Sequence, residues 1–275
     1  MMSEKLEENT IQKKGDYRGT QVISSLNSKG HVTSVCVKQI GQSDFVGGIR
    51  SLIDHTLLKP DSIEEQMVQF CNEAVENNFN VICVNAYWVP FCVSQLRGSA
   101  VKVGATVGFP LGATTTEVKV FEAKQAIKNG AGEIDMVLNI GALKSGQFTE
   151  VFHDIREVVR VCHKHDVLIK VILENCLLSD LEKVAACLIA QQAGADFVKT
   201  STGFNGKGAT VEDVRLMREV VGSRTGVKAS GGIRSYEDAK NMVEAGANRI
   251  GTSAGITIAL EESGQKTNET SHNVY

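Results

Sequence analysis

Lys199 has the sequence setting of a reactive amine. It closes a short apolar run and is followed at once by three hydroxyl residues and a glycine, as expected where a buried strand opens into a polar loop. An ammonium group held away from water loses its proton more readily, and only the neutral amine attacks a carbonyl carbon. Lys199 is therefore a candidate for Schiff-base formation, although most strand-end lysines simply reach solvent.

Three further residues could support that chemistry from other apolar runs. Lys170 and Lys228 offer two more positive charges, and Asp135 offers a carboxylate. Two adjacent ammonium groups disfavour each other's charge, so one amine of such a pair can be neutral at about pH 7. A neighbouring carboxylate can carry protons through a water molecule. The structural alternative is that Lys170 or Lys228 only neutralises Asp135 in an ion pair, but three lysines beside one aspartate favour catalysis.

Glycine-rich segments indicate a phosphate site. Residues 203–208 lead into a helix-like segment at Thr210, residues 230–232 follow the run that contains Lys228, and residues 251–253 open the last helical segment. Glycine lets backbone N–H groups approach an anion, and the N-terminus of a helix adds a favourable dipole. One such loop often only turns the chain, whereas three of them together favour phosphate binding.

These residues need a scaffold that brings several strand ends together, and the chain has the pattern for one. From about residue 50 onward, short apolar runs alternate with amphipathic segments of helical length. Continuous apolar strands that alternate with helices are typical of a parallel sheet covered by helices. Eight strands are predicted, at residues 51–58, 81–85, 101–107, 133–138, 167–173, 196–200, 226–229 and 248–251.

The segments between these strands carry helix signals. Ser62, Ser179, Thr210 and Ser235 each precede an acidic residue by three positions, which is the spacing of a capping box, and glycines follow several of the helical segments. The alternation predicts an α/β fold, a closed (β/α)8 TIM barrel, because no GxGxxG motif follows the first strand to favour an open dinucleotide-binding sheet. Active sites of TIM barrels lie at the C-terminal ends of the strands, where the lysines and Asp135 would converge.

The same pattern divides the chain into three parts. Residues 46–260 form the predicted barrel, a single domain. Residues 1–45 are poorly patterned, offer one strand-like stretch at residues 32–40, and are interpreted as an N-terminal extension of mixed or disordered character. Residues 261–275 form a short polar tail that we expect to be flexible.

The bulk composition limits the partners. A net charge of −3 without a basic patch argues against nucleic acid and against a membrane surface. The chain starts without an apolar signal segment, and no run approaches the length of a membrane span. The seven cysteines form no CxxC pair, and the six histidines are scattered without metal-binding spacing. We therefore expect a cytoplasmic protein that acts on a small molecule without a metal or cofactor.

Five motifs together resemble the deoxyribose-phosphate aldolase family. In order along residues 50–258 they are IDHTLL at 53–58, VGFPLG at 107–112, EIDMV at 133–137, VKTSTGF at 198–204 and VKASGGIR at 227–234. The resemblance implies a class I aldolase that reversibly cleaves 2-deoxy-D-ribose 5-phosphate to D-glyceraldehyde 3-phosphate and acetaldehyde, in deoxyribose phosphate catabolism. We expect such an enzyme to be a homo-oligomer, with a dimer favoured.

The resemblance also assigns roles to residues. Lys199 would form the imine, and Lys228 would favour its neutral amine and join the proton relay. Asp135 would move protons through water, with Lys170 in support. Tyr275 matches the terminal tyrosine that family members often carry on a mobile tail. The substrate contacts would come from Asp54, Cys83, Thr202, Gly203, Gly231, Gly232 and Ser253.

Two departures from the family pattern and two alternatives remain open. Ala254 stands where some members have a second serine, and residues 1–45 have no counterpart in the motifs. Another phosphosugar-binding barrel could use the lysines only as charges, without a covalent intermediate. A barrel that serves as a non-catalytic scaffold is the second alternative, but it would be expected to lack a lysine or the acid.

Overall fold

Eight parallel strands close into a barrel, as the sequence predicts. The computed structural model describes residues 11–17, 20–26, 32–37 and 48–265 of the 275-residue chain. Around the barrel each strand pairs with the next along the chain, and the last, β11, pairs with the first, β4. The strands are β4 Ile53–Leu57, β5 Val81–Val84, β6 Lys102–Val107, β7 Glu133–Val137, β8 Leu168–Ile172, β9 Phe197–Lys199, β10 Gly226–Ser230 and β11 Arg249–Thr252.

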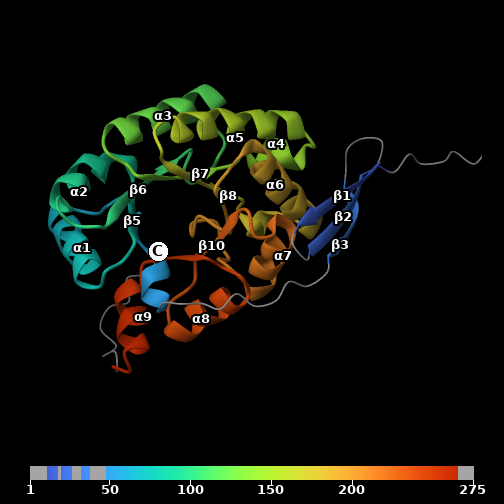
Figure 1. Cartoon of the computed structure of the whole chain (residues 1–275). Coiled ribbons are helices and arrows are strands. Elements are labelled where there is room, and N and C mark those ends of the chain that lie inside the picture. Colours follow the sequence, from blue (N-terminus) through green and yellow to red (C-terminus); the bar gives the residue numbers. More distant parts are fainter. Residues whose placement is uncertain (1–10, 18–19, 27–31, 38–47, 266–275) are drawn as a thin grey trace, which may run out of the picture.

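Helices surround the barrel on its outer side (Figure 1). The α-helices are α1 Glu64–Glu76, α2 Val89–Gln95, α3 Thr116–Lys128, α4 Ile140–Lys144, α5 Phe148–His163, α6 Asp180–Ala193, α7 Val211–Val221, α8 Tyr236–Glu244 and α9 Gly255–Glu262. Short 3₁₀ helices are η1 Ile49–Leu52, η2 Ala86–Trp88 and η3 Asn175–Leu177. In the part of the chain that the structure describes, no helix has the length and apolar character needed to cross a membrane.

Three of the four helix starts predicted from capping signals are found where the sequence places them. The capping boxes at Ser179 and Ser235 are confirmed, and the Thr210 hydroxyl accepts a hydrogen bond from the first turn of α7. The cap predicted at Ser62 is wrong. The Ser62 hydroxyl donates to the preceding turn, to the carbonyl of Lys59 at 3.0 Å, and Ile63 is the N-cap of α1 instead.

Charged side chains occupy part of the barrel interior, where bulky branched residues usually pack. Strand alternation turns Glu133 and Asp135 of β7 to the inside, while Ile134 and Met136 pack in the apolar core under the helices. Glycine at position 251 leaves room for this arrangement, because a Cβ there would lie 2.9 Å from Cε of Lys228. The interior is thus shaped to hold long charged side chains.

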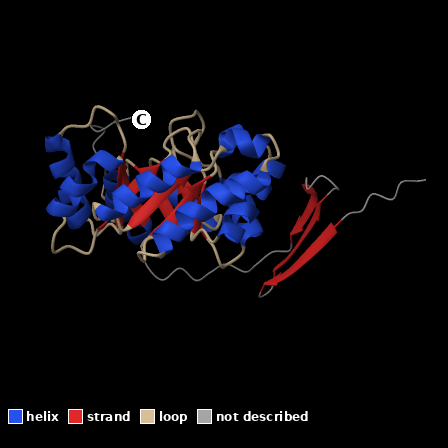
Figure 2. Cartoon of the chain, turned by 90° about the horizontal axis from the view of Figure 1, so that it is seen from above, coloured by secondary structure: helices blue, strands red, loops and turns tan. Residues whose placement is uncertain are grey.

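The N-terminal segment is more regular than its sequence indicates. Strands β1 (Ile11–Tyr17), β2 (Thr20–Leu26) and β3 (Val32–Val37) form an antiparallel sheet, which lies outside the barrel wall (Figure 2). β3 matches the strand-like stretch expected at residues 32–40. β1 and β2 match no predicted strand, because IQKKGDY and TQVISSL are largely polar. The division into extension, barrel and tail remains a prediction; α9 ends at Glu262, just inside the expected tail.

Candidate active site

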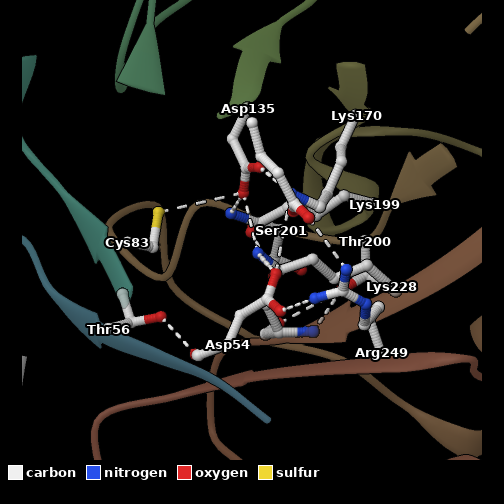
Figure 3. A network of polar contacts seen from close by, with 12 residues as sticks. Asp54, Thr56, Cys83, Asp135, Lys170, Lys199, Thr200, Ser201, Lys228 and Arg249 are labelled. Carbon is white, nitrogen blue, oxygen red and sulfur yellow. Dashed lines mark hydrogen bonds and ion pairs between the residues drawn. The ribbon is translucent and has the colours of Figure 1, made fainter. Parts of the chain in front are cut away.

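Four residues that the sequence predicts at one site lie together inside the barrel (Figure 3). Lys170, Lys199 and Lys228 come from the neighbouring strands β8, β9 and β10, and the strand register pairs Lys199 directly with Lys228. Asp135 on β7 is the register partner of Lys170. All four residues are at most 2% exposed. Water therefore contributes little to the solvation of these charges.

The Asp135 carboxylate is the point where the three amines meet. Its Oδ2 atom accepts hydrogen bonds from Nζ of Lys199 at 2.7 Å and from Nζ of Lys228 at 2.9 Å. Its Oδ1 atom accepts a hydrogen bond from Nζ of Lys170 at 2.9 Å. Because one oxygen serves both Lys199 and Lys228, these two amines are held close to each other.

The lysines keep Asp135 ionised. Burial alone would raise the pKa of the Asp135 carboxyl, but the positive charges of Lys170, Lys199 and Lys228 hold that pKa well below its usual value. Asp135 is therefore a carboxylate in the free protein at neutral pH. Its protonation by a reacting group or by water would be transient.

Neighbouring carboxylates favour the charged form of two of the lysines. Burial would lower the pKa of Lys228, but Asp135 and Asp54 raise it above its usual value, and Asp135, Asp54 and Glu133 do the same for Lys170. Both lysines do form the ion pairs with Asp135 that the structural alternative describes. Lys199 differs from them, because among the described residues its amine is ion-paired to Asp135 alone.

Two buried residues without a role predicted from the sequence, Glu133 and Arg249, extend the cluster. Arg249 Nη2 donates to Glu133 Oε1 at 2.9 Å, and Arg249 Nη1 donates to Asp54 Oδ1. Asp54 is fully buried, and its Oδ2 atom lies 2.6 Å from Lys228 Nζ. A substrate contact for Asp54 therefore stays a prediction. Glu133 and Arg249 each stand as a charged residue within an apolar run, which was the signal that could have found them. The sequence does not show which partner each one contacts.

Cys83 lies on β5, beside the same carboxylate. Its Sγ atom is 4.0 Å from Oδ2 of Asp135, and the residue is 1% exposed. Burial and the negative charge of Asp135 raise the pKa of the Cys83 thiol. It is therefore a neutral, weakly polar group at the edge of the cluster.

The chain segments that follow β9 and β10 are joined by hydrogen bonds. Thr200 Oγ1 donates to the carbonyl of Ser230 at 3.1 Å and accepts from its N–H at 3.0 Å. Ser230 Oγ donates to the carbonyl of Ser201 at 2.6 Å. These bonds fix the two glycine-containing loops against each other at the C-terminal end of the barrel.

The predicted phosphate-binding residues follow three neighbouring strands. Gly203 follows β9, Gly231 and Gly232 follow β10, and Ser253 follows β11. The three glycines have φ values of +89°, +85° and +78°, a region that favours glycine. Ser253 is exposed and also lines a cavity of about 180 Å³ with residues of β4 and α1 and with Lys59, which lies between these two elements. None of Asp135, Lys170, Lys199 and Lys228 lines this cavity.

Glu174 is a further buried acid, which follows β8 and has no role predicted from the sequence. It has a left-handed backbone, with φ +59°, and is fully buried. Its carboxylate accepts hydrogen bonds from the Thr202 hydroxyl, from the Thr202 N–H at 3.2 Å and from Asn205 Nδ2 at 3.0 Å. Glu174 therefore holds the loop after β9 in place, and with it Thr202, which is predicted to contact the substrate.

Tyr275, which is predicted to support catalysis, lies outside the described residues. Among the residues that the structure does describe, no group of three or more His, Cys, Asp and Glu side chains could hold a metal ion. The chemistry available at the cluster is that of an amine placed between a fixed cation and a carboxylate, which suits covalent catalysis on a carbonyl compound.

Comparisons with known proteins agree with this arrangement. Residues 50–261 match the family model described as DeoC/LacD family aldolase. The chain is 60% identical over 214 residues to a deoxyribose-phosphate aldolase of Streptococcus sanguinis (strain SK36), which covers 78% of this chain and 96% of that one. It is 57% identical over 212 residues to a deoxyribose-phosphate aldolase of Thermococcus gammatolerans (strain DSM 15229 / JCM 11827 / EJ3), covering 76% and 94%.

A solved structure gives the same result for the fold. The structure of the deoxyribose phosphate aldolase from Aeropyrum pernix, described as a unique tetrameric structure, superposes with a TM-score of 0.74 at 33% identity. The match covers 78% of this chain and 91% of that chain. The match to the family model spans most of the chain, and it includes every strand of the barrel and all four clustered residues. The chain belongs to the DeoC/LacD family of aldolases.

Proposed function

We propose that this chain cleaves 2-deoxy-D-ribose 5-phosphate reversibly to D-glyceraldehyde 3-phosphate and acetaldehyde, through an imine on Lys199. The observation that carries the proposal is the shared oxygen of Asp135, 2.7 Å from the Lys199 amine and 2.9 Å from the Lys228 amine. The relatives named deoxyribose-phosphate aldolase support the choice of substrate. Such an enzyme acts in deoxyribose phosphate catabolism.

The first step is imine formation. The neutral Lys199 amine attacks the aldehyde carbon C1 of the open-chain sugar, a C–N bond forms, and the resulting carbinolamine loses water to give a protonated imine. Lys228 supplies the neighbouring positive charge that favours the neutral amine before attack. Asp135, held 2.7 Å from the amine, takes and returns protons through water.

The second step breaks the carbon–carbon bond. The C3 hydroxyl loses its proton to the Asp135 relay, the bond between C2 and C3 breaks, and its electron pair moves into the imine to form an enamine. Glyceraldehyde 3-phosphate leaves as the first product. The enamine is then protonated at C2, and water releases acetaldehyde and the free amine. Lys170 keeps the negative charge of Asp135 in place throughout, at 2.9 Å.

The sugar phosphate is proposed to lie over the loops after β9, β10 and β11. Gly203, Gly231 and Gly232 present backbone N–H groups without an intervening side chain, and Ser253 lies just before the N-terminus of α9. Thr202 and Cys83 are the proposed neighbours of the sugar, and Tyr275 is the proposed contribution of the tail.

The assembly and location are also proposals. We propose a homo-oligomer in the cytoplasm, with a dimer as the favoured form. The tetramer of the Aeropyrum pernix enzyme gives the competing form. Light scattering after size-exclusion chromatography distinguishes a dimer from a tetramer, and a monomer would contradict both.

Borohydride trapping tests the imine. Wild-type protein incubated with 2-deoxyribose 5-phosphate and borohydride should lose activity and gain one reduced adduct, located on Lys199 by mass spectrometry of peptides. Lys199→Leu should give no adduct, and Lys228→Leu should form it slower by several orders of magnitude, since the amine loses its cationic neighbour. Lys240→Leu, at a position on α8 where the side chain is 44% exposed, is the matched control and should behave as wild type. A wild-type protein without an adduct would refute the mechanism.

A further inference from the structure

Six buried charges form a closed ring inside the barrel. In order around the ring they alternate in sign: Asp54, Lys228, Asp135, Lys170, Glu133 and Arg249, which returns to Asp54. The successive N to O distances from Asp54 to Arg249 are 2.6, 2.9, 2.9, 2.5 and 2.9 Å, and a hydrogen bond from Arg249 to Asp54 closes the ring. We call these six residues the charge ring.

The charge ring is neutral by itself, and among the described residues Lys199 is the one further charged side chain that is ion-paired to it. Three carboxylates face three cations within the ring, so a protonated Lys199 would add a fourth buried cation without a fourth carboxylate. An uncompensated buried charge is unfavourable, and a group in such a place tends to exist in its neutral form. The whole cluster is therefore balanced when the Lys199 amine has lost its proton.

We propose that Glu133 and Arg249 are positioning residues whose charges set the protonation of the Lys199 amine from across the barrel. This inference rests on the proposed function, in which Lys199 is the nucleophile. Among the described residues, neither one is hydrogen-bonded or ion-paired to Lys199. Arg249 lies in the ring between two carboxylates, Asp54 and Glu133, and through them it fixes how many cations the cluster can hold.

Besides the six residues of the charge ring, two other titratable groups must be considered near Lys199, the Cys83 thiol and the Glu174 carboxylate. The barrel strands contribute these buried side chains: Asp54 from β4, Cys83 from β5, Glu133 and Asp135 from β7, Lys170 from β8, Lys228 from β10 and Arg249 from β11. The Cys83 thiol is neutral because burial raises its pKa. Glu174, after β8, faces the loop at Thr202 and Asn205 and makes no ion pair with Lys199 among the described residues.

The signs give opposite expectations for the two ring residues. Arg249→Met leaves three carboxylates and three lysines, so the cluster is balanced only when Lys199 is protonated. The reactive amine then appears at higher pH. Glu133→Gln leaves two carboxylates and four cations. The Lys199 ammonium group then loses its proton more readily, so the neutral amine forms at lower pH. The double variant Glu133→Gln/Arg249→Met again has one cation more than carboxylates, as the wild type has.

The test follows imine formation directly, over a range of pH. Each protein is incubated with acetaldehyde and cyanoborohydride, and the rate of adduct formation on Lys199 is measured by mass spectrometry. Acetaldehyde carries no phosphate, so only the protein titrates in this range. For Arg249→Met the midpoint of the profile should rise by about one pH unit or more relative to wild type. In the double variant it should return close to the wild-type midpoint.

Controls separate a charge effect from a folding defect. Arg249→Lys keeps the charge and should keep the wild-type midpoint even if its maximal rate is lower. Circular dichroism and thermal unfolding show whether each variant is folded, and the double variant, which leaves no unpaired ring charge, provides the test if Arg249→Met does not fold.

The outcomes distinguish this inference from the proposed function. The role of the charge ring would be overturned if Arg249→Met forms the Lys199 adduct with the wild-type pH midpoint. It would also be overturned if the midpoint is displaced equally in the single and double variants. Either result would leave the proposed aldolase activity standing. If Arg249→Met does not fold, a double variant with a midpoint far from wild type would overturn the role of the charge ring. The absence of any adduct on the wild type would instead overturn the proposed function.

Discussion

At the scale of single residues, His55 adds a pH dependence to the fold that is separate from catalysis. It lies on β4 with 2% exposure, stacks on Phe70 at 4.4 Å between ring centroids, and places Nε2 3.1 Å from a carboxylate oxygen of Glu73. Burial lowers the pKa of His55, although Glu73 acts in the opposite direction. The imidazole is therefore neutral in the folded protein over a range where it is charged in the unfolded chain.

This shift predicts a loss of stability in mild acid. The free energy of unfolding should be highest above about pH 6.5, the pKa of an unperturbed histidine, and should fall as pH drops toward the folded pKa of His55. The loss is at most about 1.4 kcal/mol per pH unit. Urea unfolding at several pH values measures it.

Two variants isolate the contribution of His55. His55→Gln should remove this part of the slope whatever its effect on overall stability, because glutamine does not titrate. His163→Gln, which replaces a more exposed histidine on α5, should leave the slope in place. A His55→Gln variant with the full wild-type slope between about pH 5 and 6.5 would contradict the assignment.

At the scale of elements, the loop after β9 depends on an acid from the segment that follows the neighbouring strand β8. Glu174 holds Thr202 and Asn205, and the Thr202 hydroxyl in turn accepts a hydrogen bond from the Phe204 N–H at 3.1 Å. The Phe204 ring of this loop also lies edge-on to Phe109, from the loop after β6, at 5.3 Å between centroids. The loop that precedes the proposed phosphate site is thus anchored from two directions.

Replacing Glu174 should weaken binding of the substrate phosphate more than it slows the reaction at Lys199. In Glu174→Gln one hydrogen-bond acceptor of the carboxylate becomes a donor, so the loop loses a bond to a charged group. The ratio of kcat/KM for 2-deoxyribose 5-phosphate to kcat/KM for 2-deoxyribose should fall by about tenfold or more. Glu212→Gln, at an exposed position in the first turn of α7, is the matched control. Equal losses for both substrates would place the effect of Glu174 on Lys199 instead of on the phosphate loop.

The same elements show how far the sequence could be interpreted. Periodicity predicted all eight barrel strands, because each is a continuous apolar run between capped helices. The convergence of Lys199, Lys228 and Asp135 followed from their common place near strand ends. Glu133 and Arg249 could not be paired in this way, because 116 residues separate them in the sequence and only closure of the barrel brings them together. The left-handed backbone of Glu174 likewise follows from its loop contacts and has no marker in the residue type.

At the scale of the whole molecule, the barrel is complete without the N-terminal sheet. Every barrel strand finds both of its neighbours within residues 53–252, and none of β1, β2 and β3 pairs with a barrel strand. The barrel is also anchored at its own start. The Ile49 N–H donates to Glu262 Oε1 at 2.5 Å, and Arg50 donates to the carbonyl of Ala259 at 2.7 Å, so η1 is attached to α9.

Deleting residues 1–47 should therefore leave a folded, active aldolase. Its kcat/KM should stay within about twofold of the full chain, because no described catalytic or ring residue is removed. A deletion that continues through residue 52 also removes η1 and its bonds to α9. For that variant we expect Tm to fall by roughly 2–4 °C for each kcal/mol lost. Loss of activity in the shorter deletion, measured with the barrel still folded, would give the N-terminal segment a function in catalysis.

The closed charge ring also limits how this chain can change over evolutionary time. A mutation that neutralises Arg249 alone removes one ion-pair partner each from Asp54 and Glu133. One that neutralises Glu133 alone removes one partner each from Lys170 and Arg249. Each is a change on the order of 3–5 kcal/mol. A lineage can cross that barrier only by replacing both residues together or in quick succession. We therefore expect positions 133 and 249 to be inherited as a unit, so that descendants keep both charges or neither.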